Sequence, residues 1–131
     1  MKALATHLRY LQFLAHNAHN QVEGPSFFAD HAFLGELYPV YEDAYDAVVE
    51  RLIGAGEKPD LVAIQAEAAA KLPEWSNVDD AFDSLLLGEA VLCRQIETLA
   101  KGEITQGTLN LLAGLADASE VRVYKLQQRR A

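Results

Sequence analysis

The chain contains 131 residues, half of them hydrophobic, and carries a formal net charge of −8. This length suits one domain with a core of its own, and the apolar content excludes a disordered chain. The acidic balance disfavours a surface that wraps nucleic acid along its whole face, because phosphate binding needs a basic footprint, but it is compatible with attraction of cations. We therefore expect residues 1–131 to form a single domain.

The lone Cys93 argues against a disulfide-bonded protein, and the first residues argue against a secreted or membrane protein. One cysteine forms no disulfide within the chain, and Cys93 falls in a helical pattern. We interpret it as a small buried apolar residue in a reducing compartment, and we expect a cytoplasmic protein. His7 and Arg9 interrupt the apolar residues near the start. No signal peptide and no contact with a membrane are therefore predicted.

The first half of the chain predicts two long helices joined by a tight turn. Apolar residues recur at steps of three and four over residues 4–22, the pattern of a helix with one apolar stripe. Gly24-Pro25 ends this helix, and Ser26 suits the N-cap of the next one. A second apolar stripe covers residues 27–52 and stops before Gly54-Ala55-Gly56.

The second half predicts a short helix followed by two more long ones. Residues 59–71 are apolar and rich in alanine, which favours a minor helix inside a long connection. The run Asn77-Val78-Asp79-Asp80 is a good helix start, because acids there face the positive end of the helix dipole. This third long helix extends to about Lys101, and the fourth begins near Thr105.

These elements predict an all-α fold. Four long helices with a short extra helix between the second and third describe a ferritin-like four-helix bundle, in which the middle connection crosses the bundle. No strand-like alternation of any length competes with this interpretation, and no glycine-rich phosphate loop or CxxC pair is present. Glu89 lies on the apolar stripe of the third long helix, where we expect it to be solvated and where the alternative is a buried or pore-facing role.

Two histidines and two carboxylates are the candidate metal ligands. His19 and His31 flank the turn, and Asp46 and Glu50 follow on the second helix. Imidazole suits transition metals and carboxylate suits hard cations, and the two together with open positions are a non-haem iron pattern. Because Asp46 and Glu50 are four residues apart, they share one helix face and converge on one or two metals.

A metal site at the centre of a single bundle is not predicted. The common di-iron carboxylate site needs a Glu-x-x-His motif on each of two helices. The sequence contains no such motif, and all four histidines lie within the first 31 residues. This absence points to the interfaces between subunits. We interpret His7 and His16 as structural residues.

The run that begins at His19 resembles the Dps miniferritins, the DNA-binding proteins from starved cells. In that family two histidines stand twelve residues apart, with a glycine and one or two phenylalanines between them, and Leu-Tyr and Asp-x-x-x-Glu-Arg follow. The matching positions here are His19, Gly24, Phe27, Phe28, His31, Leu37-Tyr38, Asp46, Glu50 and Arg51. The motifs match over about residues 16–56, and the architecture matches over the whole chain.

The resemblance implies a shell of twelve identical subunits. Iron is oxidised at two-fold interfaces, preferentially with hydrogen peroxide, and ferric mineral is stored inside, which limits oxidative damage. His19 and His31 then come from one subunit, and Asp46 and Glu50 come from its partner. Iron is the implied metal, and other divalent metals such as zinc fit the same residue types.

One turn of the second helix departs from the family pattern. The family usually has an Asp four residues after the second histidine, and Gly35 stands there. Glu36 matches a second acid of the family and is the candidate substitute. Pro39 clashes with the carbonyl of residue 35 in a helix. We therefore expect a kink that brings Glu36 or Asp30 nearer to the metal site.

The alternative function is a non-catalytic Dps-like shell with a degenerate metal site, which acts by binding DNA or a partner. Gly35 favours this alternative. Weak, salt-sensitive DNA binding is expected only from a basic group near the C-terminus, although cations there are also favoured by the helix dipole. The group is Arg122, Lys125, Arg129 and Arg130.

Overall fold

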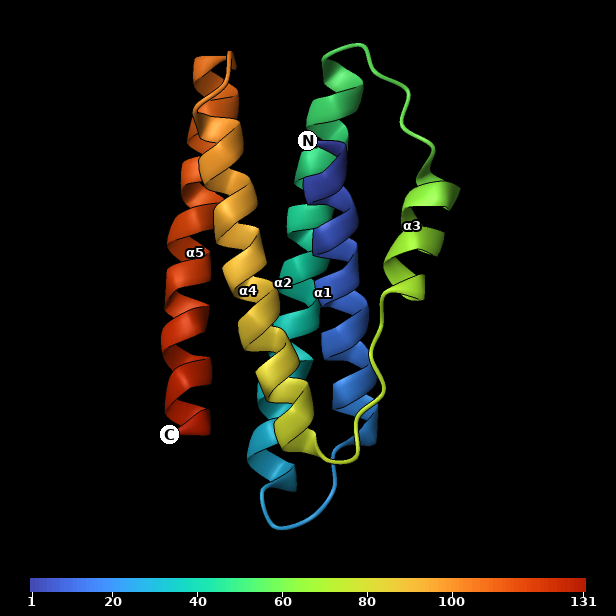
Figure 1. Ribbon diagram of the computed structural model, residues 1–131, viewed down its shortest axis with the longest axis vertical. Coiled ribbons are helices and arrows are strands. Elements are labelled where there is room, and N and C mark those ends of the chain that lie inside the picture. The colour runs from blue at the N-terminus through green and yellow to red at the C-terminus, as the bar shows by residue number, and fades with distance from the viewer.

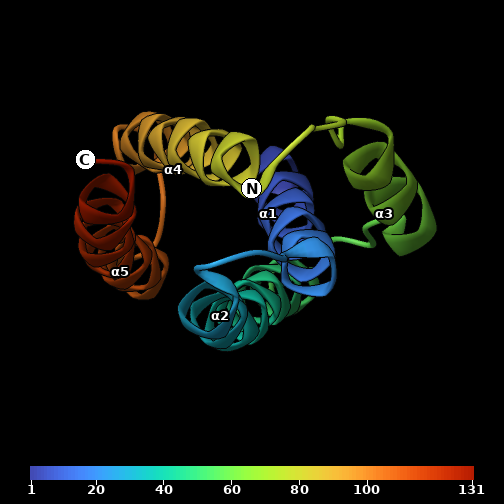
Figure 2. The same ribbon diagram turned by 90° about the horizontal axis from the view of Figure 1, so that it is seen from below.

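The computed structural model describes residues 1–131 as five helices and no strands (Figure 1). The helices are α1 (Lys2–Gln21), α2 (Phe27–Gly54), α3 (Leu61–Ala70), α4 (Val78–Ala100) and α5 (Gln106–Arg130). The four long helices form a bundle, and the short α3 lies beside α1 in the long connection between α2 and α4 (Figure 2). The predicted all-α bundle with an extra short helix is confirmed. No helix has the length and apolar character that crossing a membrane requires.

Capping side chains explain where three of the helices begin. Asp60, Asn77 and Thr105 each accept a hydrogen bond from the backbone N–H three residues later, at 3.0, 3.1 and 3.2 Å. Such bonds satisfy N–H groups that have no partner inside the helix. Ser26 occupies the N-cap position of α2 but makes no capping bond, because its hydroxyl donates to the Asp30 carboxylate instead, at 2.7 Å.

α1 is the central helix, and it packs against α2, α3 and α4 (Figure 2). The side chains of its predicted apolar stripe are all buried. Gly88 allows α4 to approach closely, because a Cβ built there would lie 2.5 Å from the Leu11 side chain. On the same side, His7 donates a hydrogen bond from Nε2 to the Gly88 carbonyl at 2.7 Å. His7 therefore has the structural role that the sequence predicts.

α5 is held differently, because it packs on α4 and reaches α2 through arginine side chains. Figure 2 shows α5 beside α4 and more widely spaced from α2. The guanidinium of Arg122 lies 5.0 Å from the centre of the Tyr41 ring, and Arg129 forms two hydrogen bonds of 2.9 Å with Asp30. The α2–α5 side of the bundle is thus bridged by charged groups.

Glu89 is the clearest departure from the sequence prediction. It is fully buried at the centre of the bundle, where its carboxylate accepts hydrogen bonds from the Tyr41 hydroxyl, the Ser119 hydroxyl and the Arg122 guanidinium. The expected solvated position was wrong, because a cation on α5 and two hydroxyls replace the water that the carboxylate leaves. Cys93, expected as a buried apolar residue, is half-buried, and its Sγ lies 3.2 Å from the Ser119 hydroxyl.

Candidate metal centre

His19 and His31 lie face to face at the end of the bundle that holds the α1–α2 turn. Their ring centres are 3.8 Å apart and their planes differ by 15°. The Nδ1–H group of His19 donates to the backbone carbonyl of His31 at 2.9 Å. This bond selects the tautomer whose Nε2 carries a free lone pair, the form in which imidazole binds metals.

His31 is enclosed on its other side by Phe27. The two ring centres are 4.9 Å apart, and the planes differ by 18°. Nδ1 of His31 is buried and has no hydrogen-bond partner. A buried nitrogen without a partner is costly and uncommon in folded proteins. The pair of imidazoles therefore keeps nitrogen lone pairs that the fold itself does not use.

Gly35 makes room for this arrangement. A Cβ built at position 35 would lie 3.0 Å from Cε1 and 3.2 Å from Nδ1 of His19. The His19 ring thus occupies the space where a side chain at position 35 would begin. The position that holds an acid in the family cannot hold one here without displacing His19.

Asp46 and Glu50 lie on the same helix as His31 but far along it. Both are exposed, and neither makes a hydrogen bond or an ion pair. Asp46 is fifteen positions after His31, a separation of about 22 Å at 1.5 Å per residue. Within one chain no three His, Cys, Asp or Glu side chains gather where they could hold a metal ion. The fold therefore joins the two histidines and keeps the two acids apart from them.

The comparisons with known proteins identify the fold family. Residues 2–127 match the Ferritin family, described as a ferritin-like domain. The chain belongs to the ferritin-like family. It is also similar to the "DNA protection during starvation protein" of Brevibacillus brevis, with 28% identity over 110 residues, which are 76% of this chain and 74% of the relative. This relative agrees with the predicted resemblance to the Dps miniferritins.

In this ferritin-like protein, neither Asp30 nor Glu36 joins the two histidines to form a group of three metal-binding side chains. α2 continues as one helix through Gly35 and Pro39. Asp30 is buried and bound to Arg129, and this guanidinium holds the pKa of the Asp30 carboxyl below its usual value. Glu36 is exposed beside a groove that Arg122 and Lys125 also line. Asp30 is thus bound by a cation of α5 and is not available to the histidines, whereas Glu36 makes no ion pair and stays a predicted ligand.

The basic group near the C-terminus of this ferritin-like protein is mostly paired with its own acids. Arg122 binds Glu89, as described above. Arg129 binds Asp30 and Asp79, whereas Arg130 binds Asp79 and Asp83. Of the four basic residues only Lys125 makes no ion pair. The acids that bind the three arginines lie on α2 and α4, so these ion pairs are not visible in the sequence.

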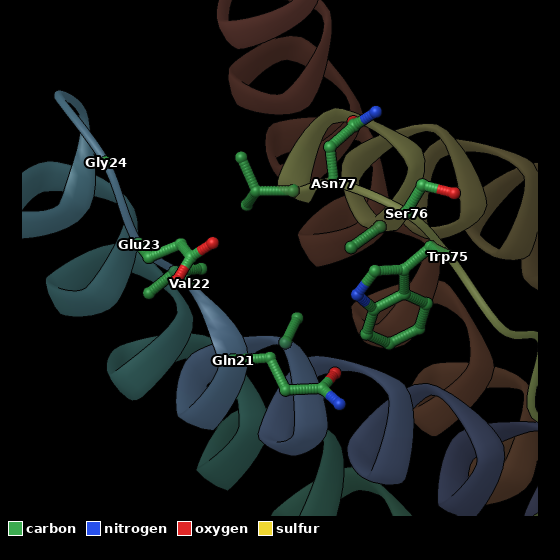
Figure 3. Close-up of a pocket in the computed structure, with 10 residues that line it drawn as sticks. Gln21, Val22, Glu23, Gly24, Trp75, Ser76 and Asn77 are labelled. Carbon is green, nitrogen blue, oxygen red and sulfur yellow. The ribbon is translucent and has the colours of Figure 1, made fainter.

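A separate pocket lies where the end of α1 meets the start of α4 (Figure 3). Its volume is about 380 Å³, and Figure 3 shows the Glu23 carboxylate and the Trp75 indole on its two sides. Ser76 and Asn77 complete the side formed by the connection before α4. No histidine or cysteine lines this pocket, so its residues do not suit a transition metal.

Proposed function

We propose that this ferritin-like protein binds and oxidises Fe²⁺ at sites between two subunits and stores the ferric product inside a hollow shell of twelve subunits. The supporting observation is the separation between the histidines and the acids along α2. Two imidazoles with unused lone pairs, one on α1 and one on α2, lie near the start of α2, and the two unpaired acids lie about 22 and about 28 Å further along it. A second copy of the chain, bound in the opposite direction, brings the two halves together.

The outer face of α2 suits such a pairing. Six exposed residues fall within about 60° of one another when successive residues are placed 100° apart around the helix. They are Phe28, Ala32, Pro39, Asp46, Glu50 and Ile53. A two-fold axis beside Pro39 and Val40 would place position 31 of one chain opposite position 48 of the other. Asp46 and Glu50 of the partner subunit would then flank His31.

The geometry of the histidines favours two ions rather than one. Stacked rings whose planes differ by only 15° have planes that meet far beyond the length of a metal–nitrogen bond, so a single ion cannot lie along both lone pairs. The 3.8 Å between the ring centres is close to the spacing of about 3.5–4 Å in two-metal sites. We infer that each ring binds its own Fe²⁺ and that the partner's carboxylates contact both ions.

Two ions match the electron demand of the oxidant. Two Fe²⁺ ions each give one electron to one molecule of hydrogen peroxide, whose O–O bond breaks. With two water molecules the products are two FeO(OH) units and four protons, so atoms and charge balance. Consuming peroxide together with Fe²⁺ would limit radical formation. We also propose that the protein acts in the cytoplasm. Zinc would compete with Fe²⁺ for the same imidazoles and carboxylates.

A subunit-mixing experiment tests the shared site. We expect the double variants H19A/H31A and D46N/E50Q each to lose at least tenfold of the peroxide-driven Fe²⁺ oxidation rate. When the two are denatured together and refolded at equal amounts, half of the pairs are mixed, and each mixed pair holds one intact site. The rate should then recover to about one quarter of the wild-type value.

The outcomes separate the proposal from its alternatives. No loss of rate in D46N/E50Q would contradict the proposed ligands, and loss without recovery on mixing would contradict a shared site. E97Q/E120Q, which removes two exposed acids from α4 and α5, is the matched control. Glu36 remains the proposed substitute for the acid absent at Gly35, and a weaker Fe²⁺ affinity in E36Q would support that role.

Gly35 also favours a second candidate, a shell that does not catalyse iron oxidation. It would bind metal weakly and act through a partner or through DNA. An intact shell that leaves the rate of Fe²⁺ oxidation equal to a control without protein would support this candidate. Gel retardation at low and moderate salt would then test DNA as the partner.

A further inference from the structure

A third imidazole stands beside the histidine pair, and the proposed function does not use it. His16 lies one turn before His19 on α1 and is exposed. Its ring lies flat on the ring of Tyr38, with 4.0 Å between centres and 10° between planes. This stacking fixes the orientation of His16, and neither of its ring nitrogens makes a hydrogen bond.

The geometry of His16 and His19 suits one shared ion better than that of His19 and His31. The ring centres of His16 and His19 are 6.4 Å apart, and their planes are inclined by 51°. Two imidazoles that bind one ion at about 2.1 Å have ring centres roughly 6.6 Å apart when they lie on opposite sides of the ion and roughly 5.3 Å apart in a tetrahedral site, so side-chain rotations that bring the rings about 1 Å closer would form the tetrahedral site. Histidines three residues apart on a helix face the same side, as chelation needs.

Tyr38 contacts both rings and so positions the pair. Besides its stacked contact with His16, it meets the His19 ring edge-on, with 5.5 Å between centres and 61° between planes. One turn further along α2, Glu42 accepts a hydrogen bond from Gln12 at 3.0 Å. Gln12 lies one turn from His16 on α1, so the exposed Glu42 carboxylate is held near the neighbouring turn of α1, where its charge favours a cation.

We propose that His16 and His19 of α1 bind one divalent transition-metal ion, with Tyr38 of α2 as the positioning residue. Both of its protein ligands come from one chain. Because Nδ1 of His19 donates to the His31 carbonyl, the ion would be held by Nε2 of His19, which is also the nitrogen that the proposed shared site uses, so the ion is one ligand exchange from that site. The role of the His16–His19 pair as an intake position for Fe²⁺ rests on the proposed function, whereas the binding itself does not.

Calorimetric titration with Co²⁺ tests the binding, because Co²⁺ prefers imidazole and is not oxidised under these conditions. The D46N/E50Q protein, which lacks the acids of the shared site, should still bind one Co²⁺ per chain. Adding H16Q should remove that ion. Y38F, which keeps the ring, should retain binding, and Y38L should weaken it at least fivefold. N17A changes an exposed neighbour and is the control.

Fe²⁺ oxidation by the wild type and by H16Q tests the intake role. We expect H16Q to raise the Fe²⁺ concentration for half-maximal rate at least threefold, a larger factor than any fall in kcat. Co²⁺ binding that is unchanged by H16Q would overturn the site. If Co²⁺ binding is lost in H16Q while oxidation by D46N/E50Q equals the wild type, the site stands and the proposed shared centre fails.

Discussion

The imidazole of His19 rests against the backbone of Gly35, so that a Cβ at position 35 would lie 3.0 Å from His19 Cε1. We predict that Gly35→Ala displaces this ring and weakens Co²⁺ and Fe²⁺ binding at least fivefold. Replacing glycine inside a helix by alanine alone stabilises by about 0.5–1 kcal/mol. The clash with His19 should cancel this gain. Calorimetric titration and urea unfolding measure the two effects.

Gly114→Ala is the matched control, because a Cβ there meets no atom within 4 Å. This exposed position inside α5 should show the full gain of about 0.5–1 kcal/mol and unchanged metal binding. Equal stabilisation in both variants, with metal binding intact in Gly35→Ala, would show that the His19 ring moves without consequence.

The buried Glu89–Arg122 pair should be strongly coupled. Glu89→Leu leaves a cation unpaired beside the core, and Arg122→Met leaves a fully buried carboxylate unpaired. We expect each single variant to lose about 3–5 kcal/mol of unfolding free energy, because desolvated charges are costly without their partners. The double variant should lose clearly less than the sum. Urea unfolding of all four proteins gives the coupling free energy, and strict additivity would refute it.

His7 should make stability sensitive to mild acid. Burial lowers its pKa below the ordinary value of 6.5. As the pH falls below 6.5, His7 becomes protonated in the unfolded chain but stays neutral in the folded protein. The unfolding free energy therefore declines with falling pH until the pH passes the lower pKa of folded His7. His7→Gln keeps an amide N–H that can donate to the Gly88 carbonyl and should flatten this decline. Urea midpoints between pH 7.5 and 5 provide the measurement, and parallel curves for the two proteins would contradict it.

DNA binding should be absent at physiological salt. Arg122, Arg129 and Arg130 already bind carboxylates of their own chain, and the net charge is −8. Few cations remain to release counterions from DNA, so affinity should be low and its salt dependence shallow. Gel retardation at 150 mM salt should show no shifted band. A tight complex that weakens steeply with added salt would mean that the ion pairs open to release their arginines.

Much of this protein is determined by its sequence alone. Helix boundaries follow from apolar spacing, from Gly24-Pro25 and from caps such as Asn77, since these signals act between residues a few positions apart. The same local spacing placed His19 and His31 across one tight turn, where they do meet. It also placed Asp46 and Glu50 on one exposed helix face.

Only the tertiary structure decided how the charged residues are used. Glu89 resembles a solvated acid until α5 brings Arg122 to it from 33 positions away. Asp30 resembles a free ligand until Arg129 binds it from 99 positions away. Gly35 resembles a lost ligand until the His19 ring fills its space. Periodicity specifies which residues share a helix face. Which partner faces them depends on how the helices pack, because desolvation, ion pairing and steric exclusion act between residues distant in sequence.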